Sequence, residues 1–211
     1  MTGFSYVALI CAAFFAVGNW LAVARDFKLL EYICKPATTV ALLATALSLD
    51  VSNTGAQVWL CVALLFSLGG DVFLMLPRDA FIPGLASFAV AQICFAVNFG
   101  LQEPTARRLI AAVIILVPGS FLLARRVIVA LKRHEHGELV MPVAGYISVI
   151  SLMAGASMAA GTAVGVVGAL LFMISDSLIA EHRFATQRKW QPVAIMVTYH
   201  FALSGIVLGL L

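Results

Sequence analysis

The amino-acid sequence predicts an all-helical protein that crosses a membrane several times and forms a single transmembrane domain. Hydrophobic residues make up 63% of the 211 residues, charged residues make up only 11%, and the mean hydropathy is +1.05. Soluble domains carry roughly 25% charged residues. At about 20 residues per spanning helix, residues 1–211 have room for roughly eight spans, and we expect no soluble domain.

Eight apolar runs, bounded by charged or turn residues, are the candidate transmembrane helices. In chain order they are Phe4–Ala24, Ile33–Leu49, Gln57–Leu76, Phe81–Gly100, Leu109–Leu131, Leu139–Ala160, Thr162–Ala180 and Pro192–Leu211. Only Gly161 and small residues separate the sixth run from the seventh, so one broken helix and a count of seven is the alternative. No basic region or cleavage site marks the first run as a signal peptide, so we expect it to be retained.

The positions of lysine and arginine support the count of eight and predict an orientation. With eight spans, all of the 13 basic residues except Arg107 and Arg108 fall on one side of the membrane. Cytoplasmic loops are enriched in Lys and Arg, so this side is expected to be cytoplasmic and both termini to lie outside. We expect a multi-pass protein of a bacterial cytoplasmic membrane, with its site toward the cytoplasm.

Asp71 and Asp176 each lie inside a long apolar run, the third and the seventh. A carboxylate at membrane depth is costly unless it is solvated, paired or protonated, which makes both residues candidate functional residues. Each lies about 6–8 Å before the cytoplasmic end of its run, at 1.5 Å per residue, so the two share one depth. The other polar residues expected at similar depth are Lys35, Tyr146, Tyr199 and His200.

Two carboxyl groups that lie close together in a low dielectric cannot both ionise easily, so one is expected to hold its proton. Such a pair fits a general acid beside a general base. It also fits a proton relay in a transporter. The simpler structural alternative is that Asp71 only pairs with Lys35 and joins two helices.

The spacing of the two aspartates favours an internal repeat. Asp71 and Asp176 are 105 residues apart, half the chain, and each follows a small residue in the third run of its half. Two four-helix units in parallel orientation would give this pattern. The halves share little else, so chance similarity is the alternative.

Other residues with reactive side chains carry weaker signals. The segment His134–Glu138 contains two histidines and two glutamates, but in a charged loop we expect them to be solvated rather than to bind a metal. The four cysteines lie in or beside apolar runs without a CxxC pair and are expected to be buried thiols. No P-loop, dinucleotide fingerprint or Ser-His-Asp spacing occurs, so no cofactor is expected.

Three motifs, in this order, resemble the YhhN-type membrane lysoplasmalogenases. They are Gly70-Asp71 followed by FLML, then Phe81-x-x-Gly84-x-x-Ser87-Phe88, then Gly168-Ala-Leu-Leu-Phe172-Met-Ile-Ser175-Asp176. Lys35-Pro36 and Tyr199 fit the same pattern, so the resemblance covers residues 33 to 205.

The resemblance implies an eight-helix enzyme that hydrolyses the vinyl ether bond of a lysoplasmalogen to a fatty aldehyde and glycerophosphoethanolamine or glycerophosphocholine. Protonation of the vinyl ether gives an oxocarbenium ion that water traps, so Asp71 and Asp176 are the expected acid and base, in either order. Lys35 or the basic loops are expected to hold the phosphate. The other expected substrate-binding residues are Gln92, Tyr146, Ser175, Tyr199 and His200.

Two positions depart from the family pattern. The family often carries a histidine where this chain has Gln92 and a polar residue near Leu203, and neither residue titrates here. His200 is the candidate to take over that role. A mechanism that depends on a histidine at position 92 is therefore not expected here.

Two other functions use the same residues. A proton-coupled small-molecule transporter would need both carboxylates, but the runs lack paired Gly/Pro interruptions and the polar residues cluster in one half of the membrane. A non-catalytic lipid-binding protein is the third candidate. The expected partners are a lysophospholipid and membrane lipids, because a net charge of +3 is too small to indicate nucleic acid.

Overall fold

The computed structural model describes residues 1–77, 80–133 and 137–211, and every regular element in these ranges is helical. The long helices are α1 (Gly3–Ala24), α2 (Lys28–Leu47), α3 (Thr54–Met75), α4 (Phe81–Gly100), α5 (Ala106–Arg133), α6 (Val140–Ala160), α7 (Ala163–Phe184) and α8 (Gln191–Leu208). A short 3-10 turn, η1 (Gly137–Leu139), precedes α6. The prediction of eight helices is confirmed for these ranges.

Seven of these helices are long and apolar enough to cross a membrane, and α2 is the more polar exception. Its first turn carries Lys28 and Glu31, whose side chains lie 3.1 Å apart, and Lys35 follows one turn later. The prediction began this helix at Ile33, because it followed the apolar run. The structure begins α2 at Lys28, because the polar residues before Ile33 are also helical.

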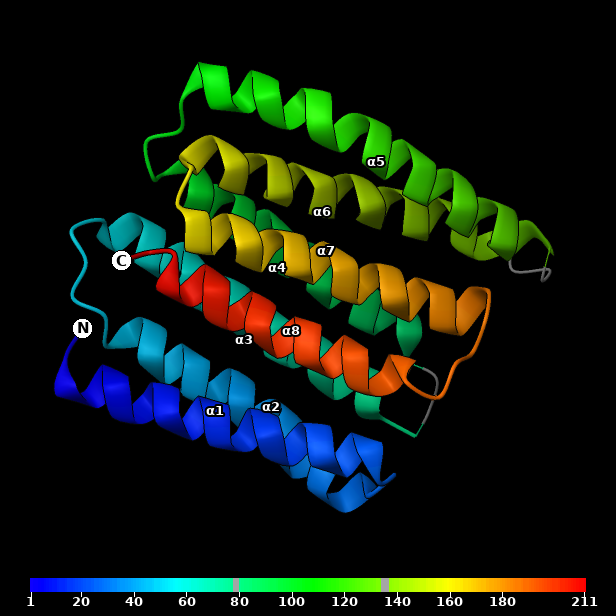
Figure 1. Cartoon of the computed structure of the whole chain (residues 1–211), viewed down its shortest axis with the longest axis horizontal. Helices are drawn as coiled ribbons and strands as arrows, with labels where there is room; N and C mark the ends of the chain where they lie inside the picture. The colour runs from blue at the N-terminus through cyan, green and yellow to red at the C-terminus, as the bar shows by residue number, and fades with distance from the viewer. Residues whose placement is uncertain (78–79, 134–136) are drawn as a thin grey trace.

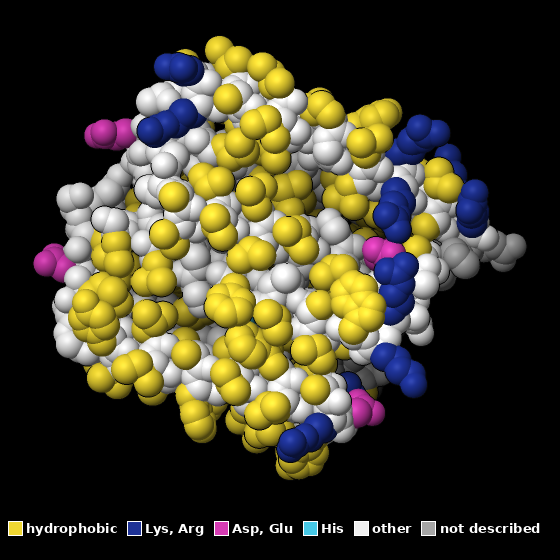
Figure 2. Space-filling view, viewed as in Figure 1, with side chains coloured by type: hydrophobic (Ala, Val, Ile, Leu, Met, Phe, Trp, Pro, Cys, Tyr) yellow, Lys and Arg dark blue, Asp and Glu magenta, His cyan; other side chains and the backbone are white. Residues whose placement is uncertain are grey.

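The helices form one bundle with α1 and α5 at its two edges (Figure 1). The pairs α1–α2, α3–α4, α5–α6 and α7–α8 pack as hairpins, and α4 packs against α6 rather than α5. The core lies between the inner helices and contains large side chains that are fully buried. Among them are Leu64, Phe95, Phe99, Phe172, Leu203 and Ile206. Apolar side chains also cover much of the outer surface, as expected where lipid replaces water (Figure 2).

Glycine determines two features that position the site. Gly161 ends α6 in the left-handed conformation, with φ +79°, so α6 and α7 are separate helices and the seven-helix alternative is wrong. Gly168 on α7 lets α8 approach closely, because an added Cβ would lie 2.7 Å from the backbone nitrogen of Ile206. The backbones of α7 and α8 are therefore in contact beside the predicted site.

The basic side chains gather at one end of the bundle. Both chain termini lie at the opposite end, where Ser5 on α1 bonds to the carbonyl of Ser48 after α2 (Figure 1). Most of the visible Lys and Arg side chains lie at the other end, where α5 and α7 finish (Figure 2). The basic residues that the sequence placed on one side of the membrane therefore lie mostly at one end of the bundle. That this end faces the cytoplasm stays a prediction.

Candidate active site

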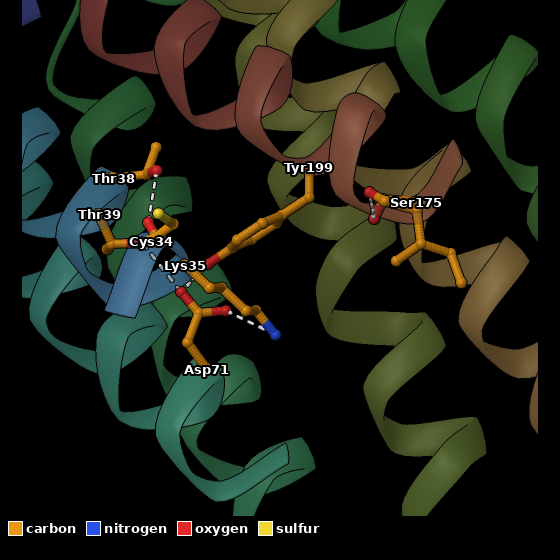
Figure 3. A network of polar contacts seen from close by, with 8 residues as sticks. Cys34, Lys35, Thr38, Thr39, Asp71, Ser175 and Tyr199 are labelled. Atoms are coloured by element: carbon orange, nitrogen blue, oxygen red, sulfur yellow. Dashed lines mark hydrogen bonds and ion pairs between the residues drawn. The ribbon is translucent and has the colours of Figure 1, made fainter. Parts of the chain in front are cut away.

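Asp71 on α3 is fully buried and is surrounded by partners from two other helices (Figure 3). Lys35 Nζ lies 3.3 Å from Oδ1. The hydroxyls of Thr39 and Tyr199 each donate a hydrogen bond of 2.9 Å to Oδ2. A buried charge needs an opposite charge and hydrogen bonds to offset its desolvation. One cation and two hydroxyl donors provide both for an ionised Asp71.

Local sequence explains this convergence. Lys35 and Thr39 are four residues apart on α2 and therefore lie on one helix face. Gly70 brings α3 close to α4, because an added Cβ would lie 2.5 Å from the ring of Phe88. The structure buries Lys35 against Asp71, whereas the sequence placed Lys35 at the cytoplasmic rim as a phosphate contact.

Asp176 on α7 lies in a different environment. It is half-buried and accepts a short hydrogen bond from the Tyr146 hydroxyl on α6. Both side chains border a narrow cavity of about 60 Å³ between α3, α4, α5, α6 and α7. Apart from Tyr146, Asp176 and Ser177, the walls of this cavity are apolar. Asp176 is thus a carboxyl group that faces an apolar cavity and whose partner is a neutral phenol.

Tyr199 on α8 belongs to the Asp71 centre. Its hydroxyl donates to Oδ2 of Asp71. The rings of Phe88 and Phe172 pack edge-on against Tyr199 and hold it in place. In residues 1–77, 80–133 and 137–211 no hydrogen bond joins the two carboxyl groups directly. The two carboxyl groups, expected to lie close together, are instead each bonded to a separate tyrosine.

Each aspartate bonds to the second helix of its own half of the chain. Asp71 on α3 pairs with Lys35 on α2, and Asp176 on α7 pairs with Tyr146 on α6. This correspondence is what the parallel four-helix repeat predicts. The repeat itself stays a prediction.

Two further predicted residues have different placements. Ser175 is buried and donates to the carbonyl of Ile195, so it joins α7 to α8 and lies apart from Asp71 (Figure 3). Gln92 on α4 is fully buried, and within the described chain neither of its polar atoms has a hydrogen-bond partner by geometry. Gln92 does not line the cavity at Asp176, so its role in substrate binding stays a prediction.

His200 on α8 is buried and accepts a 3.0 Å hydrogen bond at Nδ1 from the indole nitrogen of Trp20 on α1. An indole N–H can only donate, so Nδ1 is unprotonated and the neutral ring carries its proton on Nε2. Among the described residues Nε2 has no hydrogen-bond partner. His200 therefore presents a donor at Nε2, which argues against a role for Nε2 as a general base.

Sequence reasoning missed Trp20 and Thr39. A tryptophan near a helix end is the usual membrane-interface residue, so nothing in the sequence separates Trp20 from that class. Thr39 follows Lys35 by one helical turn, and this spacing was the available signal. Residues 134–136 of the His134–Glu138 segment, which was expected to be solvated, lie outside the described residues.

Comparisons with known proteins agree with the motifs. The model of the YhhN family matches residues 30–210. Human lysoplasmalogenase TMEM86B is 35% identical over 149 residues, which cover 71% of this chain and 62% of that protein. Mouse TMEM86B is 28% identical over 206 residues, or 96% and 84%. The lysoplasmalogenase of Mycobacterium tuberculosis is 28% identical over 187 residues, or 85% and 69%.

The match spans less than two thirds of the human protein, and only 58% of the pig protein TMEM86B. No solved structure matches the chain. The family model, by contrast, covers nearly all of the chain, including every residue placed at the two aspartate centres. The chain belongs to the YhhN family.

Proposed function

We propose that the protein is a membrane lysoplasmalogenase, which hydrolyses the vinyl ether bond of a lysoplasmalogen to a fatty aldehyde and glycerophosphoethanolamine or glycerophosphocholine. The observation that carries the proposal is Asp176, a carboxyl group bonded to Tyr146 at the wall of an apolar cavity. The names of the human, mouse and mycobacterial relatives support the same activity.

Asp176 is the proton donor in this proposal. Cleavage of a vinyl ether begins when an acid delivers a proton to the β-carbon, which leaves an oxocarbenium ion. The acid must therefore be protonated and must reach the alkenyl chain. A neutral carboxylic acid is less costly than a carboxylate beside apolar walls, and Asp176 has no cation among its described partners.

Asp176 also regains its proton later in the same reaction. Once Asp176 has given up its proton, its carboxylate can take a proton from the water that adds to the oxocarbenium ion. The product is a hemiacetal, which breaks into the aldehyde and the free glycerol hydroxyl. One carboxyl group thus acts first as acid and then as base, and the net change is the addition of one water.

Asp71 acts through Tyr199 in this account. Asp71 is completely enclosed by its partners, so it has no surface for the substrate. Its negative charge fixes the Tyr199 hydroxyl, and the ring of Tyr199 packs on Phe88, which also lines the cavity at Asp176. Asp71 is therefore a positioning residue, and both aspartates are needed for different reasons.

The experiment is to incubate the purified protein in detergent with a lysoplasmalogen and to measure the aldehyde released. The matched control is a lysolipid with the same headgroup and a saturated alkyl ether, which cannot be protonated at a double bond. We expect aldehyde from the first lipid and none from the second. Binding of both lipids without aldehyde release would leave the lipid-binding alternative, and proton-driven uptake into vesicles would favour the transporter.

A further inference from the structure

A second candidate lipid site lies outside the active site, at the basic end of the bundle. A hollow of about 490 Å³ lies between the last turns of α5 and the segment after α7. Arg125, Arg126 and Arg133 line it on the α5 side, and Thr186 lines it on the other side. We name these four residues the arginine hollow. Lys and Arg side chains gather at this end of the molecule, on the right of Figure 2.

The positive charge of the arginine hollow is only partly compensated. Arg126 lies 3.0 Å from Glu181 on α7, and Arg188 lies 3.9 Å from the same carboxylate oxygen. Glu181 thus already faces two guanidinium groups. Arg125 and Arg133 have no ion-pair partner in the described ranges. The hollow therefore retains net positive charge where two guanidinium groups can receive an anion.

The floor and the neighbouring surface are apolar. Leu122, Val129, Ala130 and Ala185 complete the lining of the hollow. On the side toward the membrane centre, α5 exposes large apolar side chains, such as Phe121 at 66% and Leu122 at 63%. An anion that binds here therefore has an apolar helix face directly beside it, which suits an acyl chain better than water.

We propose that the arginine hollow binds the headgroup of an anionic phospholipid from the surrounding membrane, with an acyl chain along the exposed face of α5. Guanidinium groups bind phosphate oxygens in bidentate geometry. Basic pockets between membrane helices on the cytoplasmic side suit anionic headgroups. This lipid is a ligand distinct from the substrate, because the hollow shares no lining residue with the cavity at Asp176.

The position of the arginine hollow gives the bound lipid a structural effect. In the described chain α5 buries only Ala112, Val127 and Leu131, so it is the least embedded long helix. Its neighbouring residues Leu122 and Leu123 face the hollow and the Asp176 cavity respectively. A lipid that bridges α5 and the end of α7 therefore braces one wall of that cavity. This last effect on activity rests on the proposed function, whereas lipid binding does not.

The test compares the double variant Arg125→Gln/Arg133→Gln with Arg107→Gln, which removes a charge at the other end of the same helix. Phosphatidylglycerol binding to the detergent-solubilised protein is measured by native mass spectrometry and by the rise in Tm. We expect the wild type and Arg107→Gln to bind this lipid alike. The double variant should bind about 25-fold more weakly, at about fivefold for each arginine near a membrane surface.

Two further arms identify the ligand. Phosphatidylcholine and inorganic phosphate at equal concentration should raise the Tm of the wild type little, because the first lacks net charge and the second lacks a chain. If the Gln double variant does not fold, the double variant Arg125→Lys/Arg133→Lys is measured in its place. It keeps both positive charges, so we expect it to keep most of the Tm rise with phosphatidylglycerol. Equal binding by the Gln double variant, or an equal Tm rise with inorganic phosphate, would overturn the proposal whether or not the protein hydrolyses lysoplasmalogen.

Discussion

Lys35 on α2 and Asp71 on α3 form an ion pair inside the bundle, with 3.3 Å between Nζ and Oδ1 and with 7% and 0% of the two side chains exposed. Lys35 is thus buried and already paired with a carboxylate, whereas a lysine that binds the substrate phosphate would be exposed at the membrane surface. The lysine neutralises the aspartate that fixes Tyr199, so its main effect is expected on the catalytic step rather than on substrate capture.

Removing the charge of Lys35 should therefore destabilise the protein. Lys35→Met keeps much of the side-chain volume but leaves Asp71 buried without its cation, a loss of about 3–5 kcal/mol when one partner of a buried pair is removed. The double variant Lys35→Met/Asp71→Asn removes both charges and should recover most of that loss. The free energies of unfolding in detergent measure both effects.

The kinetic constants of Lys35→Met separate the two roles of this lysine. A tuning lysine predicts a lower kcat with little change in KM, since the interaction is with Asp71 rather than with substrate. A higher KM with unchanged kcat would show that Lys35 anchors the phosphate, as the sequence led us to expect.

Asp71 and Tyr199 should act as one unit. Tyr199→Phe removes only the hydroxyl that bonds to Asp71 and keeps the ring that packs on Phe88 and Phe172. We expect Tyr199→Phe and Asp71→Asn each to lower kcat, and the double variant to be no slower than the slower single variant, because residues that act as a unit are not additive. Fully additive losses would show that Asp71 acts independently of Tyr199.

The sequence prediction that His200 binds the substrate can be tested at Nε2, which has no hydrogen-bond partner among the described residues. His200→Gln places an amide donor near the position of Nε2, whereas His200→Asn keeps only a group near Nδ1 that can accept from Trp20. If Nε2 contacts the substrate, KM should rise in the Asn variant and stay close to the wild type in the Gln variant. Equal KM values in the two variants, with equal Tm, would make His200 a packing partner of Trp20 alone.

The basic end of the bundle should face the cytoplasm. In a background without the four native cysteines, Arg133→Cys should be shielded from an impermeant thiol reagent in intact cells, and Ser52→Cys should react. Both positions are exposed, so accessibility depends on the side of the membrane. The opposite labelling pattern would reverse the orientation and move the arginine hollow to the outer surface.

The sequence predicted the helices better than their contacts. Apolar runs gave helix ends within a few residues, and α4 has the predicted bounds Phe81–Gly100. Asp71 and Asp176 stood out because carboxyl groups are rare in apolar runs. The pairing of Asp71 with Lys35 was one of the alternatives, but its hydroxyl partners lie 32 and 128 residues away and depend on how the helices pack. The hydrogen bond between Trp20 and His200 spans 180 residues and has no local signal.

The turnover of Asp176→Asn with lysoplasmalogen tests whether Asp176 is the acid that protonates the vinyl ether. Asparagine keeps the size of the side chain and cannot donate the acidic proton, so aldehyde release should fall at least about 100-fold, the lower range for losing a positioned acid. The variant should keep the Tm of the wild type to within a few degrees, because Asp176 is half-buried and bonded to a neutral phenol. A folded Asp176→Asn protein that releases aldehyde at nearly the wild-type rate would contradict the assignment of Asp176 as the acid.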